Sequence, residues 1–336
     1  MKNIYVVCPA NLSTGGPEVL HQLCYTLRRL KYNAQMYYYG FDKVKNSSPT
    51  PMDYKMYNNP FVLNIEDNEN NIIIIPEVRY DMLKIYHKSK LIFWWLSVDN
   101  YLNQQISGGL LYKLGMSKLT IYKLKRKVHL INDVDLLSNK VIHFVQSKYA
   151  EELCKYLNVP IKNIYYLSDY LNPVFIKNAI NKEVDIKKEN IVLYNPKKGY
   201  KFTKKIIEKA TDIRFIPLIN LSRIEVSNLL LKSKVYIDFG NHPGKDRIPR
   251  EAAISGCCII TGMKGAAKYY EDIPISNEFK FKDDIKNIDL IINKIRDIMY
   301  NFEMNTSKFK EYRTFIRNEE NTFKNNVINI FDKIAK

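Results

Sequence analysis

The chain has 336 residues, of which 46% are hydrophobic and 12% aromatic, and this apolar content excludes a disordered or fibrous protein. Its 52 Lys and Arg against 35 Asp and Glu give a formal net charge of +17, so we expect an anionic partner: nucleic acid, anionic lipid or a phosphorylated substrate. No apolar run approaches the ~20 residues of a membrane-spanning helix or resembles a secretory signal. The five cysteines include no C-x-x-C pair, which predicts reduced core thiols in a cytoplasmic protein.

The first half of the chain alternates apolar runs with helical periodicity. Helices are expected over residues 17–30, where apolar side chains recur at helical spacing, and after Ser147, a residue type that begins helices. The apolar, often β-branched runs between helices are typical of parallel strands covered on both faces. The expected strands are residues 4–7, 34–39, 72–75, 91–96 and 141–145.

The second half repeats this pattern after a polar stretch without clear periodicity, residues 170–188, which predicts a linker. We therefore predict an α/β protein with two Rossmann-like domains, residues 1–172 and 185–300, and C-terminal helices at 301–336 that pack back towards the first domain. Two such sheets predict a central cleft at the carboxyl ends of the strands. The expected strands are 191–194, 214–218, 235–239 and 257–260, and the expected helices are 202–210, 223–233 and 249–255.

A glycine turn follows the first expected strand, and it contains Gly15, Gly16, Pro17 and Glu18. Glycines let the backbone approach a ligand closely, and the free N–H groups at the start of a helix attract anions. An ordinary turn between a strand and a helix would have the same composition.

Acidic side chains follow two later strands of the first half. Asp99 comes after the aromatic run that ends near residue 96, and Glu77 follows the strand before it. At these places a carboxylate could act as acid or base against a sugar ring. The alternative for Asp99 is a capping residue at the start of the next helix.

Two lysines, Lys197 and Lys198, and Gly199 follow the first strand of the second half. Lysines beyond a strand end can reach a diphosphate bound at that edge of the sheet. A solvated loop would also carry such a charge run.

The most specific segment is residues 239–260, in which a strand, a loop rich in charged residues and a helix follow one another. Arg247, Arg250 and the helix start at Pro249 predict an anion site, and Glu251 could accept hydrogen bonds from a ribose diol. The alternative is a surface Arg–Glu pair on an ordinary helix. The following strand leads to another glycine turn, at Gly265, which we expect to precede a helix and to face phosphate.

This arrangement resembles the nucleotide-sugar site of GT-B fold glycosyltransferases, and the architecture resembles that superfamily along nearly the whole chain. The resemblance implies that Gly15 and Gly16 face the donor phosphates and the acceptor. It implies that Lys197 and Lys198 hold the diphosphate and that Glu251 binds the ribose.

The sequence departs from the retaining members of that superfamily. They carry a second Glu eight positions before the ribose-binding one, where this chain has Pro243 beside His242, and their catalytic histidine is absent. Whether the enzyme retains or inverts stays open. For an inverting enzyme, Asp99 is the first candidate base, with Glu77 and Glu18 behind it, and His242 is a further catalytic candidate.

The function that this resemblance implies is sugar transfer from a nucleotide sugar to a glycan or lipid-linked acceptor, as in capsule or lipopolysaccharide synthesis. No metal and no cofactor are expected, because no D-x-D pair follows a strand at the site and basic groups can neutralise a diphosphate. Residues 110–130 are basic and interleaved with apolar side chains, which predicts a cytoplasmic enzyme that can lie on an anionic membrane surface. The alternatives are a nucleic-acid-binding protein, for which no known motif is present, and a sugar-nucleotide epimerase.

Overall fold

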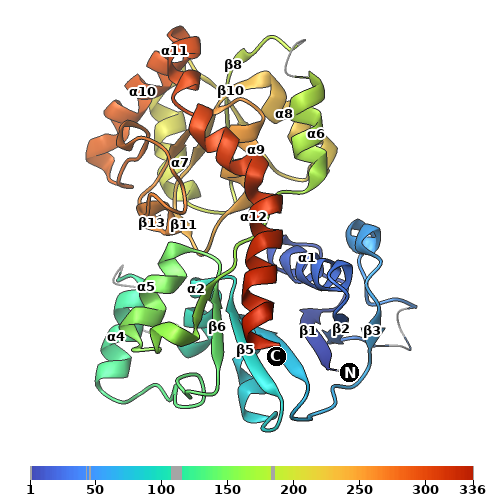
Figure 1. Ribbon diagram of the computed structural model, residues 1–336. Coiled ribbons are helices and arrows are strands. Elements are labelled where there is room, and N and C mark those ends of the chain that lie inside the picture. The colour runs from blue at the N-terminus through green and yellow to red at the C-terminus, as the bar shows by residue number, and fades with distance from the viewer. Residues whose placement is uncertain (1, 43, 45–46, 107–115, 183–185, 336) are drawn as a thin grey trace. The chain divides into compact units, whose positions relative to one another are not determined.

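The computed structural model describes residues 2–42, 44, 47–106, 116–182 and 186–335 (Figure 1). The chain divides into two compact units. The first contains Met1–Asp169 and Thr322–Lys336, and the second contains Tyr170–Asn321.

The first unit is built on a parallel sheet with strand order β3-β2-β1-β4-β5-β6-β7. The five predicted strands are confirmed, and their buried β-branched and aromatic side chains form the core of the unit. Two strands, β3 and β7, were not predicted, because they have only two and three residues and no readable periodicity. The strands are β1 Asn3–Pro9, β2 Asn33–Tyr39, β3 Phe61–Val62, β4 Ile72–Pro76, β5 Lys90–Trp95, β6 Ile142–Val145 and β7 Ile164–Tyr166.

Several helices of the first unit begin after a serine whose side chain accepts a hydrogen bond from the first turn. Ser147 accepts a hydrogen bond from the Ala150 backbone and starts α5, as predicted. The end of α12 lies in this unit, where Phe331 packs against Tyr32 at 5.7 Å between ring centroids. The helices are α1 Gly15–Arg29, α2 Val98–Gln105, α4 Lys118–Lys127, α5 Lys148–Tyr156 and α12 Lys310–Ile334, with 3-10 helices η1 Met52–Tyr57, η2 Glu77–Lys84 and η3 Ile161–Asn163.

The second unit has a four-stranded parallel sheet in the order β12-β10-β8-β9, and a small parallel pair, β11 and β13. All four predicted strands form, and their apolar side chains make one continuous core with the helices that cover them. The strands are β8 Glu189–Tyr194, β9 Arg214–Pro217, β10 Ser233–Asp238, β11 Asn241–His242, β12 Cys258–Thr261 and β13 Lys264–Gly265. The helices are α6 Pro173–Lys182, α7 Tyr200–Lys209, α8 Arg223–Lys232, α9 Arg247–Ile254, α10 Ile288–Tyr300 and α11 Phe302–Ser307, with 3-10 helices η4 Ala266–Lys268, η5 Asn277–Phe279 and η6 Ile285–Asn287.

Three local expectations for the second unit are wrong. The stretch predicted as a linker contains helix α6, in which Phe175 and Ala179 join the core. Helix α9 begins at Arg247 rather than at Pro249, because a proline needs no backbone N–H in the first turn. Gly265 is followed by the short 3-10 helix η4, not by an α-helix, so it offers no helix start to a phosphate.

No helix among the residues described above has both the length and the apolar character needed to cross a bilayer.

Candidate functional site

The loops after β8 and β10 meet backbone to backbone at the carboxyl edge of the second sheet. Gly199 has a φ of +62°, and a Cβ there would lie 2.0 Å from the carbonyl oxygen of Phe239. Gly240 has a φ of +99°, and its Cβ would lie 2.6 Å from the Gly199 nitrogen. No other amino acid fits either position without moving the main chain. Sequence reasoning gave these glycines no role, although each stands just beyond a predicted strand.

Asp283 holds the loop after β10 to the loop after β12. Its Oδ2 accepts the Gly240 N–H at 2.9 Å and lies 3.1 Å from Lys264 Nζ. Only 3% of the Asp283 side chain is exposed, and a Cβ on Gly262 would lie 2.5 Å from Asp283 Oδ1. The residue was not predicted, because nothing near it in the sequence forms a motif.

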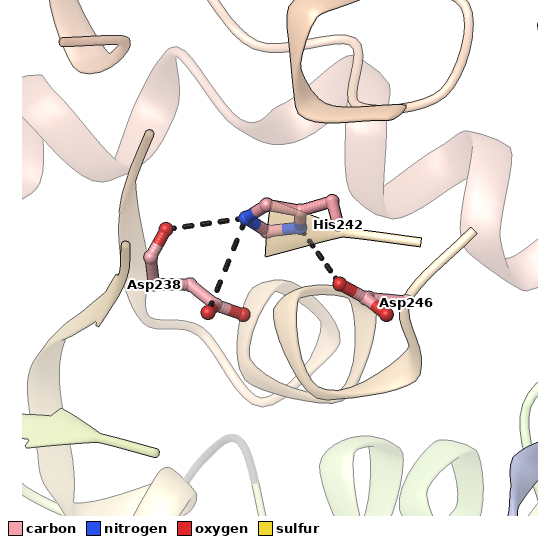
Figure 2. Close-up of side chains that lie close together, drawn as sticks. All are labelled: Asp238, His242 and Asp246. Carbon is pink, nitrogen blue, oxygen red and sulfur yellow. Dashed lines mark hydrogen bonds and ion pairs between the residues drawn. The ribbon is translucent and has the colours of Figure 1, made fainter. Parts of the chain in front are cut away.

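A cluster of four ionisable side chains lies within these loops, and Figure 2 shows three of them, Asp238, His242 and Asp246. His242 has its Nδ1 2.7 Å from Asp246 Oδ2 and its Nε2 3.2 Å from the Asp238 carbonyl oxygen. The fourth member, Lys198, has its Nζ 3.0 Å from Asp238 Oδ1 and 2.5 Å from Asp246 Oδ2. The cluster therefore joins the β8–α7 loop to the β10–α9 loop.

Burial and ion pairing act against one another in this cluster. Burial alone would lower the pKa of Lys198, but the Asp238 and Asp246 carboxylates raise that pKa above its ordinary value. Burial alone would raise the pKa of Asp246, but the Lys198 ammonium and His242 hold it well below its usual range. Both groups therefore stay ionised at neutral pH.

The donor atoms of Asp238, His242 and Asp246 lie within 4.8 Å of one another, a spacing that could hold a metal ion. The Lys198 ammonium lies against both carboxylates, where such an ion would need to sit. A side chain of the protein thus occupies this position and offsets one of the two negative charges. His242 is fully buried, with Nδ1 facing the Asp246 carboxylate and Nε2 facing the Asp238 carbonyl oxygen, so it fixes the loop, and its predicted catalytic role is not supported.

The structure does not support the prediction that Arg250 binds an anion. Its side chain is 0% exposed, and its Nη1 lies 2.9 Å from Glu319 Oε2. Lys245 Nζ lies 2.9 Å from the other carboxylate oxygen of Glu319, and the Lys245 side chain is 2% exposed. The three groups form a buried ion triad between the start of α9 and helix α12.

The other predicted donor residues lie around the same edge. Lys197 is exposed, and within the described part of the chain its ammonium has no ion-pair partner. Arg247 is half-buried at the first position of α9, Pro249 follows in the first turn, and Glu251 is 9% exposed in the second turn. Gly265 has a φ of +59°, and its Cβ would lie 2.0 Å from the His242 carbonyl oxygen, so its glycine serves backbone packing.

In the first unit, Glu77 and Asp99 follow the adjacent strands β4 and β5. Glu77 accepts the Leu96 N–H at 3.2 Å and the Asn100 side-chain amide at 3.3 Å, and burial raises its pKa to about 7. Asp99 is 5% exposed and accepts the Tyr149 hydroxyl at 3.2 Å. The cap of α2 is Ser97, so Asp99 is not the capping residue. Both carboxyl groups are held by neighbours, and Glu77 is poised to exchange a proton near neutral pH.

The glycine turn of the first unit is part of helix α1. Neither Gly15 nor Gly16 has left-handed backbone angles, and a Cβ on Gly16 would only touch Leu96 at 3.8 Å. Glu18 is 2% exposed and accepts the Tyr57 hydroxyl of η1 at 3.2 Å. Glu18 is thus as buried as Glu77, and its carboxylate is held by η1.

Comparison with known proteins shows the fold. No protein-family model and no curated protein matches the sequence. Anabaena HepE in complex with UDP aligns with a TM-score of 0.62 at 9% identity, over 99% of this chain and 100% of HepE. Sucrose-phosphate synthase from Thermosynechococcus elongatus aligns at 0.63 with 10% identity, over 99% of each chain. WaaG, a glycosyltransferase involved in lipopolysaccharide biosynthesis, aligns at 0.51 with 11% identity, over 97% of this chain and 99% of WaaG. The chain has the GT-B fold of these proteins, with two Rossmann-like units, as predicted.

Proposed function

We propose that this protein is a glycosyltransferase that takes a sugar from a nucleotide-diphosphate donor. The observation that carries the proposal is the carboxyl edge of the second sheet, where tightly packed glycine loops carry the exposed Lys197 and lead into helix α9, which begins at Arg247 and holds Glu251 in its second turn. Solved proteins of this fold hold UDP and UDP-glucose. In this proposal Glu251 receives the ribose, and Lys197 and Arg247 receive the diphosphate.

Lys198 has a different position from Lys197 in this proposal. Its ammonium is already held by Asp238 and Asp246, so a diphosphate would have to compete with two carboxylates for it. A diphosphate faces no such competition for the ammonium of Lys197, so Lys197 is the first phosphate ligand in this proposal. Gly15 and Gly16 would face the donor phosphates and the acceptor.

The test is nucleotide binding. Calorimetry with UDP and with UDP-glucose is expected to show binding, with and without EDTA, because basic side chains neutralise the diphosphate. Glu251→Ala is expected to weaken UDP binding about tenfold or more, the worth of one charge-assisted hydrogen bond. Glu208→Ala, an exposed glutamate of α7, is the matched control. Equal affinities of Glu251→Ala and the wild type would remove the central assignment.

Deprotonation of the acceptor hydroxyl is assigned to Asp99, with Glu77 as the alternative. Asp99→Asn keeps the shape of the side chain and its contact with Tyr149 but removes the base. Turnover of UDP-glucose is expected to fall by about 10²–10⁴-fold while UDP affinity stays unchanged. A fully active Asp99→Asn enzyme would discard Asp99, and the same assay on Glu77→Gln would then test the alternative.

The acceptor is proposed to be a glycan or a lipid-linked glycan of a surface polysaccharide, met at an anionic membrane. Helix α4 has five basic residues and no acidic one, and it ends beside the exposed Val128 and Leu130, 61% and 72% accessible. Residues 110–115 of the predicted basic segment lie outside the described residues. Binding to vesicles that contain anionic lipid, lost in a Lys123→Glu, Lys127→Glu variant and absent with neutral vesicles, would support this surface. Equal binding of the variant would refute it.

A further inference from the structure

A cavity of about 490 Å³ opens at the amino ends of the strands in the second unit, the edge opposite to the proposed donor loops. Its walls include Lys187 and Lys188 before β8, Lys234 at the start of β10, and Ser255 before β12. Arg313 of α12 also lines the cavity. A cavity of this size is in the range that proteins use for small organic ligands.

Charge in this cavity is strongly one-sided. Four lining residues are basic, Lys187, Lys188, Lys234 and Arg313, and one is acidic, Glu303. Lys188 serves the fold, because its Nζ donates to three carbonyl oxygens at the ends of helices α8 and α9 and the start of β10, at 2.6–3.1 Å. Its positive charge nevertheless remains at the wall of the cavity.

Two lysines can offer donors to a ligand. Lys234 uses one N–H on the Met299 carbonyl oxygen at 2.7 Å, with the Phe302 ring at 5.4 Å, and an ammonium has three N–H groups. Lys187 is exposed, and within the described residues its ammonium has no hydrogen bond or ion pair. Ser255 is 4% exposed, and its Oγ is buried with no hydrogen-bond partner among the residues described, which is rare for a buried hydroxyl.

Apolar side chains form another part of the wall, with Thr306 as a further polar lining residue. The apolar residues are Ala179, Ile186, Leu231, Ile254 and Phe302. An apolar wall beside several ammonium groups suits a ligand that has an anionic group at one end and an apolar body at the other. We propose that this cavity binds a small organic phosphate or carboxylate with an apolar body, at a site separate from the donor loops.

The experiment uses the intact chain and phenyl phosphate as the probe, in calorimetry at low salt, first without UDP and then with saturating UDP. Binding with a Kd of about 1 mM or tighter is expected, and inorganic phosphate should bind at least several-fold more weakly because it lacks the apolar body. Lys234→Ala should weaken phenyl phosphate about tenfold. Lys187→Ala should weaken it about threefold, and because Lys187 is exposed this variant should keep its fold. Lys286→Ala, an exposed lysine away from the cavity, is the matched control and should bind as the wild type does.

Three results would overturn the proposal. The first is the absence of binding heat at 10 mM phenyl phosphate, a concentration about ten times the expected Kd. The second is equal affinity for phenyl phosphate in the wild type and both lysine variants. The third is displacement of phenyl phosphate by UDP. Equal affinity for inorganic and phenyl phosphate would overturn the apolar part of the assignment. Loss of UDP binding in Glu251→Ala with unchanged phenyl phosphate binding would show that the two sites are separate, so failure of one proposal is distinguishable from failure of the other.

Discussion

Replacing Glu319 with Gln tests whether the buried ion triad stabilises the second unit. The substitution keeps the volume of the side chain but leaves Arg250 and Lys245, 0% and 2% exposed, facing a neutral amide instead of a carboxylate at 2.9 Å. Removing one partner of a buried ion pair costs about 3–5 kcal/mol, because the remaining charge is desolvated without compensation. For a unit of this size each kcal/mol lowers the melting temperature by about 2–4 °C. We therefore expect the second unit to melt roughly 6–20 °C lower.

The assay is differential scanning calorimetry, which resolves the transitions of the two units if they melt separately. The matched control is Asp212→Asn, which removes the 2.9 Å pair with Arg296 in the same unit, where the two side chains are 58% and 49% exposed. An exposed pair contributes at most about 1 kcal/mol, so this control should shift the transition by only a few degrees.

A Glu319→Gln protein that melts within a degree of the wild type would refute this reasoning, because two buried cations would then have lost their carboxylate without cost. The same variant also tests the role of Arg250. If the arginine is held by Glu319 and does not touch the donor, UDP affinity at 20 °C should stay within about twofold of the wild type. A large gain in UDP affinity would mean that the released guanidinium can reach the diphosphate.

Three further predictions concern single positions. Gly199→Ala should destabilise the second unit by more than about 1 kcal/mol, because a φ of +62° is unfavourable for alanine and its Cβ would lie 2.0 Å from a backbone oxygen. Chemical denaturation measures this change. The control for backbone strain alone is Gly40→Ala, where φ is +72° and a Cβ would have nothing within 4 Å. Burial raises the pKa of Glu77 to about 7 in the folded protein, so the wild-type stability should fall as the pH rises from about 4.5 to 7. Glu77→Gln should lack that fall, and parallel slopes for the two proteins would contradict it. Asp283→Ala should weaken UDP binding, since it releases the Gly240 N–H and Lys264, and an unchanged Kd would exclude Asp283 as a residue that positions the site.

Strands such as β4 and β5 could be predicted because they are short, continuously buried apolar runs, and such a run is visible in consecutive residues of the sequence. Ser147 could be predicted as a cap because its partner, Ala150, lies three residues away. Arg250 could not be placed, since its partner Glu319 lies 69 residues further along the chain. An arginine at a helix start has the same local sequence whether it meets a ligand or an internal carboxylate. Whether the arginine meets a ligand or an internal carboxylate depends on which residues the fold buries beside it, and that is not visible in the local sequence.

The same distinction applies to the net charge of +17. Lys198 and Lys245 lie against carboxylates within the second unit, so they add little to the field outside it. The attraction for anions must therefore come from cations with no carboxylate partner among the described residues, such as the exposed Lys197, Lys127 at the end of α4, and Lys187 and Lys234 of the cavity at the opposite edge of the second sheet. Because these groups are exposed or line an open cavity, their attraction should be screened by salt. Binding of UDP and of phenyl phosphate should then weaken as ionic strength rises, whereas the buried triad should be nearly insensitive to it.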